Sequence, residues 1–435
     1  MFYRFLIIIA IFFSVSFSQS FFNRMIGNEV GYISARSHAM GQTYFMTSNN
    51  SALTLRNPAR LSQFKPGIYF DYNPMGSVLL ERRSIDLKDY FGDFLVEGDY
   101  VANNNVNFYN HFGLIINTRL FFLNFSAGLS HGPWSSFDYS YEEEVRGSAS
   151  FNDGIIGIRD PIEGYHILEN SGDMNLTSVG VALGINESVS VGASLNYIHD
   201  GSYDYKLDAI TIAESPQNLA SVFSDNGSVD FDGEIFPSLS VNLKTGKTEI
   251  AIGYESNANI QSPGFNSTQV QNFDYSLGLP IYLENNQSTS ELELISSLVN
   301  IEKPEKYKIG LNYRNGYRQY TLLSIELIQK IYENNIFQDS RKLNLGIEYV
   351  SYKNTFRMGL SYKESEFRVL APVTAFTLGT SSKVLDKLIF DIGASYSYQK
   401  YNYIDLFPVN GDVRPDYDNI HESVWSIIST ISYRL

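Results

Sequence analysis

The chain has 435 residues, of which 43% are hydrophobic and 14% aromatic, so it can bury a large core and is not a disordered protein as a whole. Its 47 Asp and Glu residues outnumber 32 Lys and Arg, and the net charge of -15 argues against a nucleic-acid partner, which would need a basic surface. The absence of Cys excludes disulfide bonds and a lipid-modified cysteine. Stability must therefore come from backbone pairing and packing.

The first 18 residues predict a secretory signal peptide. A short basic start over residues 1–4 precedes an apolar run over residues 5–15, and small residues follow at Ser16 and Ser18. The alternative, a retained membrane anchor, fits less well because the run is shorter than the roughly 20 residues of a spanning helix. No later apolar run reaches about 18 residues, so helical membrane spans are not expected.

Residues 19–66 carry turn signals but no sustained strand pattern. They contain Gly27, Gly31 and Gly41, and the pair Asn57-Pro58, in which the proline lacks a backbone donor and restricts the residue before it. If the strands that follow close into a barrel, this segment is a candidate plug, with its polar backbone satisfied by inward-facing side chains. The alternative is a loose periplasmic tail.

From residue 67 onward, apolar and polar residues alternate, which predicts strands with two different faces. For example, Tyr307, Ile309, Leu311 and Tyr313 share one phase, and the residues between them are polar or glycine. Such segments cover residues 67–73, 105–117, 119–130, 175–184, 188–199, 231–244, 247–257, 305–314, 317–330, 341–352, 355–363, 373–382, 387–398 and 422–435. These segments predict about fourteen strands. Most have a length near the 9 to 11 residues that a tilted strand needs to cross a bilayer.

The connections alternate between short and long. Tight hairpin turns are expected at residues 186–187, 245–246, 315–316 and 353–354, with Asn315-Gly316 the strongest signal because both residues tolerate positive φ. Long links are expected at residues 74–104, 131–174, 200–230, 258–304, 331–340, 364–372 and 399–421. This alternation is typical of outer-membrane barrels, which have short periplasmic turns and long outer loops. A soluble β-sandwich, the alternative, has no reason to separate the two kinds of connection.

These patterns predict an all-β protein, a transmembrane antiparallel up-and-down β-barrel of about 14 strands with an N-terminal plug. The expected domains are the signal peptide at residues 1–18, the plug at 19–66 and the barrel at 67–435. Pairing of the last strand with strand 67–73 would remove the sheet edge, which hydrocarbon requires because it offers unpaired amides no water. The outward row of the last strand would hold Trp425, Tyr433 and Leu435.

Several short motifs resemble one family of such barrels. They are the run from Ser34 to Gly41, Ser51-Ala52, Asn57-Pro58-Ala59, PEKYKIGLNYR at 304–314, DKLIFDIGASYSY at 386–398 and the terminal ISYRL. Together they look like the FadL/TodX-type outer-membrane transporters of long-chain fatty acids and aromatic hydrocarbons, over nearly the whole mature chain. The chain departs from that pattern at residues 42–46, where a glycine-rich stretch is expected, and at Asn49-Asn50, where an acidic pair is usual.

The resemblance implies a transporter in the outer membrane of a Gram-negative-type bacterium, embedded in outer-membrane lipid after insertion by the barrel-assembly machinery. Its ligand would be a fatty acid or hydrocarbon that leaves by a lateral or periplasmic exit, and Asn57, Pro58 and Ala59 would belong to a hatch that rearranges for transport. PorV-like barrels attached to secretion machinery share a similar Met-Gly and Asn-Pro-Ala opening. A PorV-like secretion component is therefore the alternative function.

A fatty acid would need an apolar pocket and a cation for its carboxylate. Candidates for the cation are the residues in the expected inward rows, namely Lys306, Lys308, Arg314, Lys342 and Arg357. The alternative for these residues is a generic polar lumen. Two apolar stretches in the link 258–304 are candidates for an outer ligand site or for strand extensions above the membrane, and they contain Leu277, Leu279, Ile281, Leu283, Leu292, Leu294 and Ile295.

The sequence does not predict an enzyme. Its six His residues are scattered without the spacing of metal ligands, and there is no G-x-S-x-G nucleophile turn. The alternative is a barrel hydrolase in which His111 or His199 is catalytic, but no motif supports a catalytic triad. We therefore expect no catalytic residues, no bound metal and no cofactor.

Overall fold

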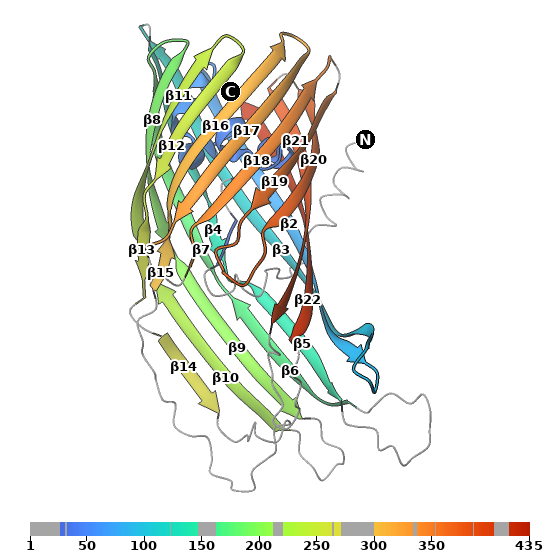
Figure 1. Cartoon of the computed structure of the whole chain (residues 1–435). Coiled ribbons are helices and arrows are strands. Elements are labelled where there is room, and N and C mark those ends of the chain that lie inside the picture. Colours follow the sequence, from blue (N-terminus) through green and yellow to red (C-terminus); the bar gives the residue numbers. More distant parts are fainter. Residues whose placement is uncertain are drawn as a thin grey trace.

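A computed structural model of the chain describes residues 27–30, 33–121, 123–146, 162–211, 221–262, 265–270, 300–333, 337–352, 354–385, 387–403 and 417–435. Fourteen antiparallel strands pair edge to edge in a ring, which the pairing of β4 with β7 closes, and β1 adds to β4 as a fifteenth strand of the same sheet. The predicted 14-stranded barrel is thus confirmed. Its overall shape is shown in Figure 1.

The ring strands follow the chain in order. They are β2 (Gly67–Lys88), β3 (Phe94–Leu120), β4 (Leu123–Ser136), β7 (Asp173–Gly184), β8 (Val189–His199), β11 (Glu234–Thr245), β12 (Thr248–Glu255), β16 (Glu305–Gly316), β17 (Tyr320–Ile331), β18 (Ser340–Val350), β19 (Thr355–Lys363), β20 (Val373–Leu385), β21 (Leu388–Tyr403) and β22 (Asp418–Arg434). As predicted, the last strand closes on the first, with Tyr69 opposite Arg434. The short hairpins and the carboxyl terminus lie together at the upper end in Figure 1, called the turn end below; the opposite end is called the loop end.

The two faces of the wall differ as the alternation predicts. Outward residues are apolar and exposed, as Leu195, Ile309 and Trp425 illustrate, whereas the lumen-facing Asn196 and Lys308 beside them are buried. An exposed apolar exterior over a polar interior suits a wall surrounded by hydrocarbon. No helix in the described residues is long and apolar enough to cross a membrane.

Five of the expected long links contain substantial strand. Residues 74–104 mostly continue β2 and β3, the link 399–421 holds the ends of β21 and β22, and the other three links hold β5 (Tyr139–Arg146), β6 (Ile162–Ser171), β9 (Gly201–Thr211), β10 (Ser221–Phe231), β13 (Ala258–Gln261), β14 (Phe265–Val270) and β15 (Asn300–Lys303). In Figure 1, strands β5, β6, β9, β10 and β14 extend the wall beyond the loop end. The sequence pattern does not predict these strands, because alternation weakens where neither face meets hydrocarbon.

The residues before β2 lie inside the ring and are called the inner segment (residues 27–30 and 33–66). It contains β1 (Asn28–Glu29), the helices α2 (Ala35–Ala39), α3 (Tyr44–Thr47) and α4 (Leu53–Arg56), and the 3-10 helix η2 (Pro58–Gln63). Ser34 is the N-cap of helix α2, and its hydroxyl accepts from the Ser37 N–H. The helices contact the inner faces of strands on both sides of the ring, with α2 against β20 and β21 and η2 against β7 and β8.

Close approach to the wall requires glycine on both surfaces. A Cβ on Gly359 of β19 would lie 2.2 Å from the Gly41 backbone nitrogen, and Gly41 itself has φ +67°. Charged side chains fix the same region, since Arg36 of α2 makes two hydrogen bonds, of 2.8 and 2.6 Å, to the carboxylate of Glu348 in β18. The inner segment therefore lies in the lumen, against the inner faces of β18 and β19.

Candidate functional site

A cavity of about 290 Å³ lies between the inner segment and the wall formed by β16 to β19. Its lining contains seven Lys or Arg and four Glu residues, so the cavity is positively charged. Other parts of the lining are apolar. The inner segment contributes Val30 and Ile33, and strands β2, β3 and β4 contribute Met75, Tyr109 and Trp134. A cavity that combines cations with apolar surface suits a ligand with an anionic head and an apolar body.

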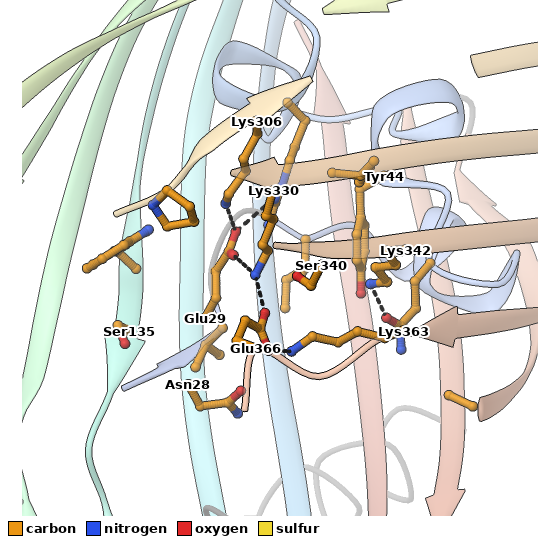
Figure 2. Close-up of a pocket in the computed structure, with 18 of the residues that line it drawn as sticks. Asn28, Glu29, Tyr44, Ser135, Lys306, Lys330, Ser340, Lys342, Lys363 and Glu366 are labelled. Atoms are coloured by element: carbon orange, nitrogen blue, oxygen red, sulfur yellow. Dashed lines mark hydrogen bonds and ion pairs between the residues drawn. The ribbon is translucent and has the colours of Figure 1, made fainter. Parts of the chain in front are cut away.

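The cations form a string in which lysines and glutamates alternate. Glu29 of β1 accepts from Lys306 at 2.7 Å and lies 3.4 Å from Lys330. Glu366, in the loop after β19, lies 2.9 Å from Lys330 and 3.2 Å from Lys363. Figure 2 shows this order, Lys306, Glu29, Lys330, Glu366 and Lys363, across the cavity. Each of the two glutamates bridges two lysines.

Strand register explains the positions of the lysines. Lys306 and Lys330 are directly opposite each other on β16 and β17, and Lys342 and Lys363 are directly opposite on β18 and β19. Like charges in such positions repel each other unless an anion lies between them. Glu29 provides that anion for the first pair.

The second pair has no such anion. Among the described residues, Lys342 makes no ion pair; its ammonium donates to the neutral amide oxygen of Gln42 at 2.7 Å. Glu326 is on the adjacent strand, but its carboxylate accepts from the Phe45 and Met46 N–H groups. A second cavity of about 250 Å³ is also lined by Lys342 and Lys363, together with Leu79, Phe367 and Leu370, so this open position lies where two cavities meet.

The glutamate on the inner segment is held in its charged form. Burial alone would raise the pKa of Glu29, but the charges of Lys306, Lys330 and Arg56 outweigh it and hold the pKa well below its ordinary value. The stabilisation that Glu29 provides is therefore present above its unfolded pKa and is lost only as the pH falls through the lower folded value.

We expect the inner segment to stay attached at mildly acidic pH. A spin label on Asn28→Cys, the only thiol in this Cys-free chain, should remain immobile from pH 7 to about 4.5, the ordinary carboxylate range, and become mobile only at lower pH. In a Lys330→Met background the transition should move to higher pH. Equal transitions in both proteins would show that the lysine does not hold Glu29.

The five cations predicted from the sequence have different positions. Lys306, Lys308 and Lys342 line the cavity, and Lys308 pairs with Glu255 of β12. Arg314 is exposed at the end of β16, where it donates to the Tyr317 carbonyl at 3.1 Å. Arg357 is buried between Glu348 and Asp391, at 2.7 Å from each, outside the cavity lining.

The predicted hatch residues lie where the inner segment meets the wall. The Asn57 amide donates to the Phe45 carbonyl at 3.0 Å, Pro58 begins η2, and the Ala59 N–H donates to the Ser240 hydroxyl of β11 at 2.8 Å. The seven apolar residues predicted in the link 258–304 lie outside the described residues. Among the residues that the structure does describe, no group of three His, Asp or Glu side chains could hold a metal ion.

Sequence reasoning did not single out Glu29, Lys330, Lys363 and Glu366. Lys330 and Lys363 end segments that alternate, so the pattern predicts that both face inward but not that they take part in a site. Nothing in the sequence around Glu29 indicates that it reaches Lys306, 277 positions later in the chain.

The wall has one irregular place, where β3 and β4 part. The two strands pair from Leu120 and Leu123 as far as Phe112 and His131. Beyond that last pair, β3 stays with β2, whereas β4 pairs with β7 and with β1 of the inner segment. Farther toward the loop end, the Asn105 side chain bonds to the Ser140 backbone of β5. Tyr109 and Trp134 line the cavity from positions within this parting.

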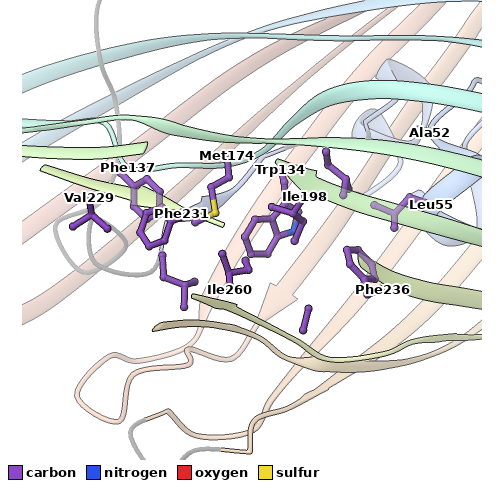
Figure 3. Close-up of a cluster of buried hydrophobic side chains, with 13 residues drawn as sticks. Ala52, Leu55, Trp134, Phe137, Met174, Ile198, Val229, Phe231, Phe236 and Ile260 are labelled. Atoms are coloured by element: carbon purple, nitrogen blue, oxygen red, sulfur yellow. The ribbon is translucent and has the colours of Figure 1, made fainter. Parts of the chain in front are cut away.

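A buried apolar cluster occupies the lumen beside the parting. Trp134, Met174, Ile198, Phe231 and Ile260 belong to it, and it reaches Ala52 and Leu55 of the inner segment (Figure 3). Trp134 belongs to both the cluster and the cavity lining. The apolar side of the cavity is therefore continuous with an apolar region that leads toward the loop end.

No family model matches the chain, and no curated protein sequence does. Solved structures do. A Pseudomonas aeruginosa FadL homologue aligns at 12% identity with a TM-score of 0.59, over 94% of this chain and 99% of that one. The Pseudomonas putida toluene transporter TodX aligns at 14% identity with a TM-score of 0.54, and the Ralstonia pickettii toluene transporter TbuX at 14% with 0.50, both over 94% of this chain and 99% of theirs. The chain therefore has the FadL/TodX-type barrel fold.

Proposed function

We propose that the chain is an outer-membrane channel for the uptake of hydrophobic compounds, and that its ligands carry a carboxylate, as long-chain fatty acids do. The observation that supports this proposal is the lysine pair Lys342 and Lys363, which lies in a partly apolar cavity and lacks the bridging anion of the equivalent pair Lys306 and Lys330. A ligand carboxylate between Lys342 and Lys363 would complete the alternating string. Structural neighbours described as a FadL homologue and as toluene transporters support the broader class.

Binding energy would come from both parts of the ligand. Each buried CH2 group contributes roughly 0.8 kcal/mol, so the apolar lining suffices for affinity toward an alkyl chain. The lysines would provide selectivity, because an ionised carboxylate is costly to bury without partners. A hydrocarbon of equal length would bind to the same apolar surface without using Lys342.

The route that we propose runs from the loop end to the cavity and then outward through the parting of β3 and β4. The inner segment blocks the turn end, which is the periplasmic side in barrels of this type. In this proposal, residues 1–18 are the signal peptide, 19–66 the plug and 67–435 the barrel, and Asn57, Pro58 and Ala59 belong to the part of the plug that rearranges. The barrel-assembly machinery and outer-membrane lipid would be its partners.

Lys342→Met is expected to weaken dodecanoic acid binding about tenfold or more, because a hydrogen bond to a charged group contributes about 1.5–3 kcal/mol. Calorimetric titration of the purified protein in detergent measures the change. Binding of 1-dodecanol should be unaffected. Arg314→Gln removes the same charge at an exposed turn and should leave both affinities unchanged. Equal binding of the acid by wild type and Lys342→Met would contradict the proposed head-group site.

A second candidate is a PorV-like component of a secretion complex. The observation that favours it is the tip of the β2–β3 hairpin, where Tyr90 and Phe91 are 98% and 86% exposed. The Asp89 carboxylate holds this turn by accepting the Phe91 and Asp93 N–H groups, each at 2.9 Å. Purification from native membranes distinguishes the candidates. A stable large complex that Tyr90→Ser disrupts, together with an absence of ligand binding, would favour the secretion role.

A further inference from the structure

A chain of hydrogen bonds runs across the outer face of the wall, beside the parting of β3 and β4. It begins at Asp200, whose carboxylate lies 2.6 Å from His199 Nδ1. His199 Nε2 lies 2.9 Å from the Thr177 hydroxyl, which lies 3.0 Å from His131 Nδ1. The two imidazole rings are stacked with their centroids 5.6 Å apart. Four polar side chains from three neighbouring strands and a loop are thus connected in sequence.

These residues face outward, where a polar chain is unusual. His131, Thr177 and His199 continue the rows of the exposed Leu129, Val179 and Leu195, whereas their lumen-facing neighbours Ser130, Ser178 and Ile198 are buried. Asp200, the residue directly after β8, has 76% of its side chain exposed. The hydrogen-bond chain therefore lies at the outer boundary of the apolar belt. Phe112 and Tyr197 lie beside it as interfacial aromatic residues.

His131 occupies the position closest to the parting. It is opposite Phe112 in the last pair that joins β3 to β4, and Gly132, the next residue, belongs to the stretch where the strands separate. A ligand that leaves the cavity past Tyr109 and Trp134 would emerge beside this imidazole. The hydrogen-bond chain thus connects the water-exposed Asp200 with the exit of the proposed route.

The hydrogen-bond chain can carry a proton in either direction. When His199 is protonated and His131 is neutral with its proton on Nε2, Asp200 accepts from His199 Nδ1–H, His199 Nε2–H donates to the Thr177 oxygen, and the Thr177 hydroxyl donates to His131 Nδ1. This leaves His131 Nε2–H as the donor at the end of the hydrogen-bond chain. Reversal of the bonds to Thr177 moves a proton from His199 to His131. The charged groups that act on His131 are His199 and Asp200.

An acid that leaves the lumen meets an electrostatic barrier. Its carboxylate is charged between Lys342 and Lys363, but an ionised carboxylate is costly to bury in hydrocarbon. Gaining a proton at the interface removes this cost. A group that can donate this proton at the exit would therefore speed release into the membrane.

We propose that Asp200, His199, Thr177 and His131 form a proton relay that neutralises a carboxylate ligand as it leaves the barrel through the parting of β3 and β4. This inference rests on the proposed function. His131 gives its Nε2 proton to the carboxylate, which becomes a neutral acid, while the Thr177 hydroxyl gives its proton to His131 Nδ1 and takes the Nε2 proton of protonated His199. His131 stays neutral with its proton now on Nδ1, and His199 becomes neutral. Exchange with water then returns a proton to His199 and moves the His131 proton from Nδ1 back to Nε2. No other reactant is consumed, and His131 would be a catalytic residue of the release step.

Thr177→Val tests the relay, because it keeps the side-chain shape and removes the hydroxyl. Wild type and variant are reconstituted in liposomes, and entry of dodecanoic acid is compared with entry of 1-dodecanol, which needs no protonation. Entry of the acid should slow at least about tenfold, since positioned proton transfer contributes 10²–10⁴-fold, and entry of the alcohol should not change. Slower acid entry in D2O should be seen in wild type and lost in the variant. Thr374→Val, on the outward row of β20, is the matched control.

Unchanged acid entry in Thr177→Val, or equal slowing of acid and alcohol, would overturn the relay. His131→Asn supplies a second variant with the same expectation, and gel mobility before and after heating verifies that each barrel is folded. Calorimetric affinity for the acid should stay at the wild-type value in both variants, because Lys342 and Lys363 are intact. If wild type speeds entry of neither compound, the proposed function fails and the relay fails with it.

Discussion

Replacement of Gly192 with Leu is expected to open the barrel to ions while the ring of strands stays closed. Gly192 faces the lumen on β8, and a Cβ there would lie 2.3 Å from the Ala59 nitrogen and 2.4 Å from the Pro58 carbonyl carbon. Backbone atoms cannot move aside as a flexible side chain can, so the inner segment must leave its place. Single-channel recording in planar bilayers should show steps approaching those of open porins, whereas wild type should show none of that size.

The adjacent residue provides the control for this prediction. Ala193 faces outward among apolar side chains, beside a hollow of the outer surface that Leu239 and Ile252 also line. Ala193→Leu adds the same atoms to the lipid side and should leave the conductance unchanged. A Gly192→Leu protein that folds and conducts like wild type would mean that Pro58 and Ala59 do not lie against β8.

Glu348→Ala is expected to cause the largest loss of stability, about 3–5 kcal/mol, because it leaves buried cations without their partner. Glu348 is 1% exposed and accepts from Arg36 of the inner segment and Arg357 of β19. Urea unfolding of the reconstituted barrel, followed by tryptophan fluorescence, measures the change. Asp99→Ala breaks a solvent-exposed pair with Arg82 and should cost no more than about 1 kcal/mol. Equal losses in the two variants would contradict the buried anchor.

The alternation of apolar and polar residues predicted the parts of the barrel wall that meet hydrocarbon. Strand 305–314 is observed as Glu305–Gly316, and the inward and outward rows of β16 are as predicted, because a one-residue slip would put lysines into lipid. The strand predicted at 67–73 extends to Lys88 instead. The prediction stopped before Pro74, which cannot donate a ladder hydrogen bond, and the β2–β22 register skips both Asn73 and Pro74.

The site was less predictable than the wall. The inward phase identified Lys306, Lys308 and Lys342 as lumen residues, but it could not show which of them a carboxylate already neutralises. That depends on Glu29, which belongs to a two-residue strand with no periodic pattern and meets the lysines only after the ring has closed. The parting of β3 and β4 was also beyond sequence reasoning, because both strands alternate normally through the stretch where they pair.

Lipid-phase quenching along β16 tests the central claim most directly. Because the natural chain has no Cys, a fluorophore can be placed on single cysteines at successive positions from Tyr307 to Tyr313 and exposed to brominated lipid. The barrel predicts strong quenching at 307, 309, 311 and 313 and weak quenching at 308, 310 and 312. Uniform quenching, or none in a protein that stays dispersed without detergent, would contradict a strand wall with one face in hydrocarbon and the other against an internal segment.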